Sequence, residues 1–187
     1  MLVLLVVAAG VGIVRHEIGA TRGPLRATQQ AHEMGVFGLS VRPGEVVDLT
    51  APVKNTSSRP VILEDASLIT LPGQPAPRFS GARLAKTLNM IGDRGWPPRE
   101  PSVALPGASV APGATAYVYY GVVGTKIGVN YGAAGITLSY RQGDHRYRVH
   151  VWGPGVACVR LKLGNDSSCD HAGPVVRDAT ERLAARD

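Results

Sequence analysis

The stretch AAGITLSYRQGDHRYRVHVW, residues 133–152, decides the fold. Two runs within it, residues 136–140 and 145–152, alternate apolar and polar side chains and flank a polar link that contains Gly143. A period of two is typical of a half-buried β-strand, and glycine in a short link supplies the positive φ of a hairpin turn. The stretch therefore predicts an antiparallel β-hairpin. Its buried face would carry Ile136, Leu138 and Tyr140 from the first strand, and Tyr147, Val149 and Val151 from the second.

The opposite face of this hairpin is basic. It would present Arg146, Arg148 and His150 from the second strand, with Arg141 beside the turn. Like charges about 7 Å apart along a strand destabilise it slightly, so acidic neighbours should pair with them or the face should stay in water. Glu64 and Asp65 are the intramolecular candidates for pairing. If it is unpaired, the face would bind an anionic partner, either lipid headgroups or an acidic polymer or protein.

The composition favours short strands over long helices. The chain of 187 residues contains 23 glycines and 14 prolines, which supply many turns. Its net charge of +6 is scattered without a basic run, and aromatic residues make up only 5%. A nucleic-acid-binding protein usually concentrates basic residues on one element near stacking aromatics, so we expect no nucleic-acid partner.

Other segments extend the strand pattern along the chain. Seven or eight short strands separated by turns predict an all-β fold, an antiparallel β-sandwich. The alternation slips at Glu64 and Asp65, which predicts a bulge or bend. Residues 82–91 are ambiguous: Leu84, Leu88 and Ile91 would share one face of a helix, and Lys86 breaks the pattern of a strand. The segments read as strands are residues 36–41, 47–53, 61–63, 66–71, 103–105, 115–123 and 156–163.

Residues 1–14 contain no charged side chain, and Arg15 ends the run. As a helix they would rise about 21 Å, which fits the apolar region of a signal peptide better than a full membrane span. No basic residue precedes them and no clean Ala-x-Ala cleavage site follows. We expect an uncleaved signal anchor at 1–14, a tether at 15–35, a β-sandwich at 36–163, and a cysteine loop with a polar tail at 164–187. The tail from Pro174 onwards would be either a marginal polar helix or disordered.

The two cysteines bear on the compartment. Cys158 and Cys169 are the only ones, and a short polar segment separates them. In a chain with an export signal, such a pair predicts a disulfide and hence an oxidising compartment. Arg15, Arg22 and Arg26 follow the apolar run and argue for a cytoplasmic domain by the positive-inside rule. We give the cysteines more weight and expect a single-pass protein whose C-terminal domain is extracytoplasmic.

Short motifs resemble those of bacterial extracytoplasmic immunoglobulin-like domains. They are Pro43-Gly44-Glu45 before one strand, the hairpin at residues 53–61 with its Asn55-Thr56 turn, and residues 110–114 before the tyrosine-rich strand. The resemblance covers roughly residues 36–163. It implies an immunoglobulin-like sandwich with an adhesion, scaffold or accessory role, and it carries no catalytic residue.

A second candidate surface lies in a proline-rich loop. Trp96 is followed by two prolines and flanked by Arg94 and Arg99. An exposed tryptophan between arginines is typical of a contact site. The simpler interpretation is a lid over an open end of the sandwich, because large apolar side chains are usually covered.

The sequence offers no recognisable reaction centre. Cys169-Asp170-His171 lacks the methionine of a copper loop, no Gly-x-Ser-x-Gly occurs, and no glycine-rich phosphate loop follows a strand. We therefore expect a membrane-tethered interaction, scaffold or accessory module without catalysis and without a cofactor. The alternative is a periplasmic or cell-surface binding protein for a small ligand or metal, and the third is an enzyme of unrecognised type.

Overall fold

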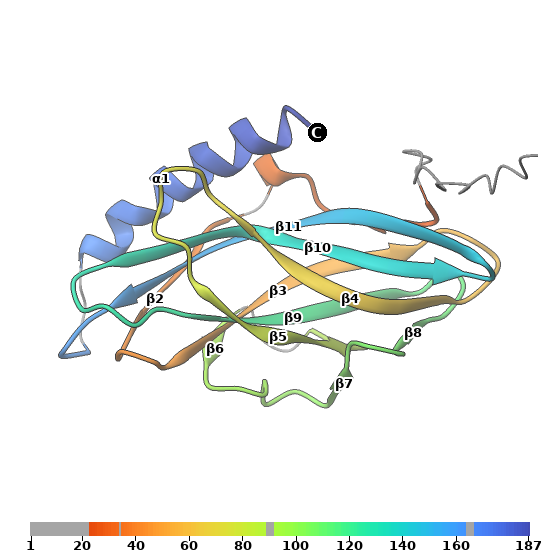
Figure 1. Cartoon of the computed structure of the whole chain (residues 1–187), viewed down its shortest axis with the longest axis horizontal. Helices are drawn as coiled ribbons and strands as arrows, with labels where there is room; N and C mark the ends of the chain where they lie inside the picture. Colours follow the sequence, from red (N-terminus) through yellow and green to blue (C-terminus); the bar gives the residue numbers. More distant parts are fainter. Residues whose placement is uncertain (1–22, 34, 89–91, 164–166) are drawn as a thin grey trace, which may run out of the picture.

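The computed structural model describes residues 23–33, 35–88, 92–163 and 167–187, which form two β-sheets around one core (Figure 1). The all-β prediction is confirmed, and the arrangement is compatible with a sandwich. The described elements are β1 (Leu25–Ala27), a 3₁₀ turn η1 (Ala31–Glu33), β2 (Phe37–Val41), β3 (Val46–Asn55), β4 (Val61–Thr70), β5 (Arg78–Ala85), β6 (Asp93–Arg94), β7 (Ser102–Ala104), β8 (Ser109–Val110), β9 (Thr115–Val123), β10 (Asn130–Gln142), β11 (His145–Val159) and α1 (Ser167–Ala184).

The strand order defines the two sheets. Sheet A runs β1-β3-β9-β5-β7, with β6 paired to β3, and sheet B runs β2-β11-β10-β4-β8. Neighbouring strands are antiparallel except for β2, which pairs parallel with β11. The expectation of a purely antiparallel sandwich is therefore wrong at this edge. A parallel neighbour is feasible here because β2 and β11 are far apart in sequence, which leaves room for a long connection.

The predicted hairpin is β10–β11. Gly143 has a φ of 57° in the turn, as the sequence requires. The register between β10 and β11 shifts between Ala133 and Gly135, and Pro154 lies in β11 at this irregularity. Proline is tolerated there because the missing N–H is not needed by a regular ladder. The expected facing pairs are present: Ile136 with Val151, Leu138 with Val149, and Tyr140 with Tyr147.

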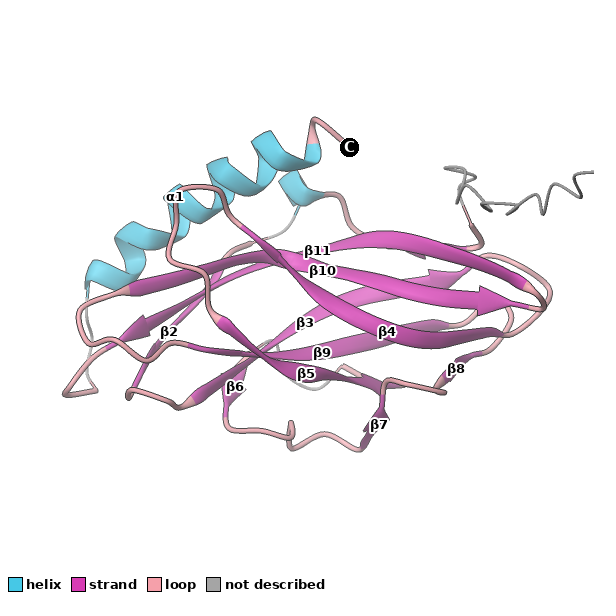
Figure 2. Cartoon of the chain, in the orientation of Figure 1, coloured by secondary structure: helices cyan, strands magenta, loops and turns pink. Residues whose placement is uncertain are grey.

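Each sheet has an additional layer on its outer side (Figure 2). Helix α1 lies over sheet B, where Cys169 and Val176 are buried against Trp152 and Val156. The helical alternative for the tail is thus present. The expected cysteine loop is corrected, because the helix already begins at Ser167 and has one apolar face. Residues 92–101 run over sheet A, on the side away from α1, and we name this segment the strap.

Two further expectations are corrected. Residues 78–85 form strand β5, so a helical face over residues 82–91 is wrong for the part that the structure describes. The tether does not extend to residue 35, because β1 pairs with β3 and Leu25 is buried in the core.

The expected anchor at residues 1–14 lies outside the described residues. Within the described ranges, no helix is long and apolar enough to cross a membrane.

Candidate interaction surfaces

The arginine side of the hairpin is exposed, as predicted. Arg146 and Arg148 are exposed and alternate with half-buried Tyr147 and Val149 along β11. A strand with one face on the core presents its other face to water. The start of β11 therefore supplies a basic surface that α1 leaves uncovered.

Part of this charge is neutralised by Glu64. Its carboxylate lies 3.6 Å from Arg141 Nε and 3.3 Å from Arg146 Nε. The register between β4 and β10 shifts beside Glu64, since Ser139 faces Asp65 whereas Tyr140 faces Leu63. A bulge re-aims a side chain, and here it presents Glu64 to both arginines. The predicted bulge thus contains Glu64, which is also the predicted acidic partner of the arginines.

Arg148 and His150, the other two residues of the predicted basic face, differ in their contacts. Arg148 forms no salt bridge with any carboxylate of the described residues. His150, by contrast, contacts the Asp187 carboxylate through Nδ1, and its ring lies edge-on to Trp152. His150 is therefore engaged by the end of the chain after α1, a contact that the hairpin pattern alone could not predict.

The beginning of the described chain is fixed to the same end of the molecule. The Leu25 N–H donates to Tyr140 Oη at 3.3 Å, and Thr56 donates to the Pro24 carbonyl through its N–H and its hydroxyl, at 2.9 and 2.8 Å. Gly23 is so close to the hairpin that a Cβ there would lie 2.1 Å from Tyr140 Oη. Gly23, the first described residue, therefore lies against the hairpin near its turn.

The strap positions Trp96 on sheet A. The cross-strand partners Gly81 and Gly121 have no side chains, which leaves a flat site for the indole. A Cβ on Gly121 would lie 3.0 Å from Trp96 Cε3, and one on Gly81 would lie 3.7 Å from Cζ2. The sequence predicted a lid over an open end of the sandwich. Trp96 instead covers the outer face of sheet A.

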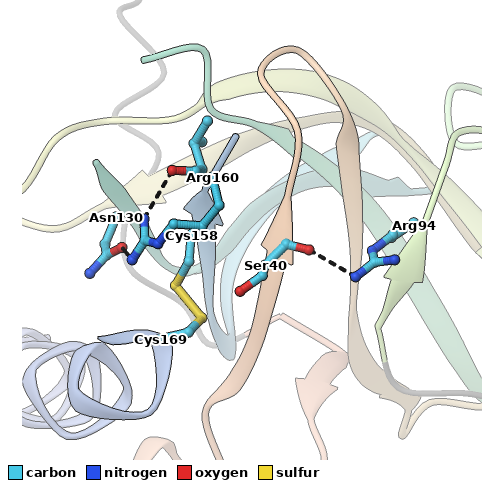
Figure 3. The surroundings of a disulfide bond; sticks show 7 residues. Ser40, Arg94, Asn130, Cys158, Arg160 and Cys169 are labelled. Atoms are coloured by element: carbon cyan, nitrogen blue, oxygen red, sulfur yellow. Dashed lines mark hydrogen bonds between the residues drawn. A yellow bond between two sulfur atoms is a disulfide. The ribbon is translucent and has the colours of Figure 1, made fainter. Parts of the chain in front are cut away.

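Both arginines of the strap have intramolecular contacts. Arg94 donates through Nη2 to the Ser40 carbonyl at 3.0 Å, and Arg99 Nε lies 3.4 Å from the Asp93 carboxylate. The first contact joins the strap to β2 of the other sheet (Figure 3). Trp96, Arg94 and Arg99 therefore lie on a different side of the domain from the hairpin arginines, and the two predicted sets do not form one surface.

Two buried acidic side chains that the sequence analysis did not identify lie at the strap, one beneath it and one within it. Asp48 is 2% exposed and Glu100 is 9% exposed. Burial raises the pKa of Asp48, and the charges of Asp93 and Glu100 act in the same direction. The Asp93 N–H donates to Asp48 Oδ1, which offsets part of this shift. The burial of Asp48 could not be predicted from its own strand, because its cover comes from Asp93 and the residues that follow it.

Cys158 and Cys169 are joined as a disulfide across 11 positions (Figure 3). The bond connects the end of β11 to the first turn of α1. Beside it, Arg160 Nη2 donates to Asn130 Oδ1 at 2.9 Å. The predicted pairing is present, and it joins helix to sheet where a loop closure was expected.

The hollows beside α1 offer little for a small ligand. One of them, of about 370 Å³, lies next to the disulfide and is lined by Val36, Gly38, Asp170 and Arg177, among others. Its volume is at the low end of the range of small-molecule sites. Among the described residues, no three histidine, cysteine, aspartate or glutamate side chains are placed to hold a metal ion.

Comparisons with known proteins do not assign a family. No family model matches the sequence, and no curated protein matches it. Among solved structures, the fold is similar to a family 123 glycoside hydrolase from Clostridium perfringens, which was analysed for glycolipid glycan hydrolysis. The identity is 14% and the TM-score 0.34, over 72% of this chain and 24% of that one. The chain thus spans about a quarter of that enzyme's length.

This match corrects the expectation that the chain is not an enzyme, because the protein that it resembles is one. The likeness is too low to carry an argument for any activity. We therefore withdraw the exclusion of catalysis and assign no reaction.

Proposed function

We propose that this chain is a membrane-tethered, extracytoplasmic interaction module with an immunoglobulin-like sandwich. Residues 1–14 would anchor it as a single-pass protein, and the described domain would face the extracytoplasmic side. The disulfide between Cys158 and Cys169 supports this compartment, because such bonds persist where the surroundings are oxidising.

The immunoglobulin-like resemblance is supported by the role of Asn55. This side chain is buried, and its amide donates to the carbonyls of Arg59 and Val110 at 2.7 and 3.0 Å. Its Oδ1 accepts from the Ser57 N–H at 3.0 Å. Asn55, the first residue of the Asn55-Thr56 turn, thus fixes the β3–β4 connection and holds β8 beside it.

The observation that carries the proposal is the uncovered arginine side of β11. Helix α1 and the strap cover large parts of the two outer faces, whereas Arg146 and Arg148 remain exposed on a strand that is paired along its length with β10. Charged groups on a rigid scaffold steer an oppositely charged partner and determine which partner is accepted. We therefore expect an anionic partner, either a protein or another acidic component of the cell surface.

Affinity capture from detergent-solubilised membranes tests this function with the full chain as bait. We expect Arg146→Glu/Arg148→Glu to lose salt-sensitive partners that the wild type retains. The matched control is Arg42→Glu/Lys162→Glu, which changes the net charge equally near the opposite end of β11 and should retain them. Identical recovery by all three proteins would show that the arginine side binds no partner.

A further inference from the structure

The hairpin end combines the first described residue, Gly23, with an excess of positive charge. Gly23 lies against the rings of Tyr140 and Tyr147, which stack with their centroids 5.4 Å apart. Leu25 and Asn55 are register partners, so the end of β3 lies here as well. The basic side chains on these elements are Arg26, Lys54, Arg59, Arg141, Arg146 and Arg148, and the acidic ones are Glu64, Asp65 and Asp144.

The acidic side chains leave several of these charges unneutralised. Glu64 is shared between Arg141 and Arg146. Arg26, Arg59 and Arg148 are exposed and form no salt bridge within the described part of the chain. Guanidinium groups bind phosphate oxygens well because their planar donors match two oxygens at once.

Covalent geometry keeps this end close to any membrane that holds residues 1–14. Eight residues, 15–22, separate the apolar run from Gly23. Even when fully extended they span at most about 30 Å. A surface that is tethered so closely meets its ligand at a high effective concentration, so weak individual contacts are sufficient.

We propose that the hairpin end is a binding surface for anionic phospholipid headgroups and holds the domain against the bilayer in which its own N-terminal segment is anchored. This inference rests on the anchoring part of the proposed function. The exposed arginines bind headgroup phosphates, and the opposite end, with Pro43 and Thr125, points away from the membrane. Each basic residue near an anionic surface contributes about fivefold to binding, an effect that salt screens within a Debye length.

The test uses the full chain with its disulfide intact, reconstituted into nanodiscs of neutral phosphatidylcholine or of phosphatidylcholine with phosphatidylglycerol. A fluorophore is attached at Ser58→Cys, in the exposed turn at the hairpin end, or at Thr125→Cys, its matched control at the opposite end. Lipids with a nitroxide on the headgroup quench a fluorophore that is near the bilayer surface.

We expect the Ser58 label to be quenched at least about twofold more in anionic than in neutral nanodiscs at low salt, and high salt should abolish the difference. The Thr125 label should show no such difference. Arg148 is exposed and has no ion pair among the described residues, so Arg148→Gln should reduce the difference, and Arg146→Glu/Arg148→Glu should remove it.

Equal quenching of the Ser58 label in the two lipids, or stronger quenching of the Thr125 label, would overturn the proposal. These outcomes leave the interaction function intact, because partner capture from membranes is measured separately. Conversely, lipid-dependent quenching without any captured protein would make the headgroups themselves the partner. Labelled protein that leaves the nanodiscs would refute the anchor, and with it both proposals.

Discussion

The outer faces of the two sheets are covered in different ways. Over sheet B, α1 buries apolar side chains, and a disulfide attaches its first turn to β11. Over sheet A, the strap covers Asp48, and the buried Thr50 two positions further along β3 has no hydrogen-bond partner for its hydroxyl among the described residues. The strap is held by one indole, a short pairing with β3 and the Arg94 contact.

This difference predicts that the two covering layers respond to different solution conditions. Apolar burial and a covalent bond depend little on pH, but the bond depends on the redox state. A buried carboxylate, in contrast, makes the stability of its surroundings depend on pH. The helix side should therefore respond to reductant, and the strap side to acid and to changes at Trp96.

Loss of the disulfide should have the largest effect. Closing a loop of 11 positions stabilises the folded state by about 3 kcal/mol in the entropic model, so Cys158→Ala/Cys169→Ala should lower the free energy of unfolding by about that amount. Hydrogen exchange should accelerate in α1 before it does in the strap. Chemical denaturation and exchange measurements check both, with reduced wild type as the control.

An unchanged unfolding midpoint in reduced wild type would show that apolar contacts alone hold α1. Thiol labelling before and after reduction verifies the starting state. Equal labelling in the two samples would show that the two cysteines are not joined in the protein.

Removal of the Trp96 indole should have the next largest effect. Trp96→Ala uncovers Gly121 and should destabilise the domain by about 2 kcal/mol, below the roughly 3–5 kcal/mol of fully buried aromatics, because this side chain is only partly buried. Gly121→Ala should disturb the same contact from the opposite side, since its Cβ would crowd the ring. Urea denaturation measures both variants.

Normal stability in both variants would contradict the covering role of Trp96. A loss of membrane partners at normal stability would then restore the contact-site interpretation of this tryptophan. Arg99→Gln is a suitable control, because its exposed ion pair with Asp93 should contribute little.

The hairpin could be predicted because its determinants are local. Alternation over residues 136–151 and the Gly143 turn specify strands, register and faces without help from distant residues. The disulfide also followed from the cysteine count. The bulge at Glu64 appeared as a break in the pattern, although its function of pairing two arginines required the neighbouring strand.

The covering layers could not be predicted in the same way. The apolar face of α1 is interrupted in sequence by Gly173 and Pro174, and the helix is stable because sheet B offers it a surface. The burial of Asp48 depends on a strap that begins at Gly92. The pairing of β1 likewise depends on tertiary contacts, since three residues have too little pattern to predict a strand.

The smallest expected effect concerns Asp48, and it fixes the sign of the pH dependence. Burial raises the pKa of Asp48 above its unfolded value of about 3.9, so the folded state binds the proton more tightly. This group therefore lowers the stability of the folded state as the pH rises from about 4 through its folded pKa. Below the unfolded value both states are protonated and the penalty is absent.

Asp48→Asn should remove this penalty, because an amide oxygen can still accept from the Asp93 N–H and the side chain carries no charge beside Asp93 and Glu100. We expect a gain of about 1 kcal/mol at pH 7, the scale of a buried charge whose hydrogen bond offsets part of its desolvation. The gain should shrink towards zero below pH 4. Denaturation of both proteins across this range measures it, with exposed Asp65→Asn as the matched control. A loss of stability at pH 7 would mean that the ionised carboxylate holds the strap in place, and the contrast between the two covering layers would then be one of bond type alone.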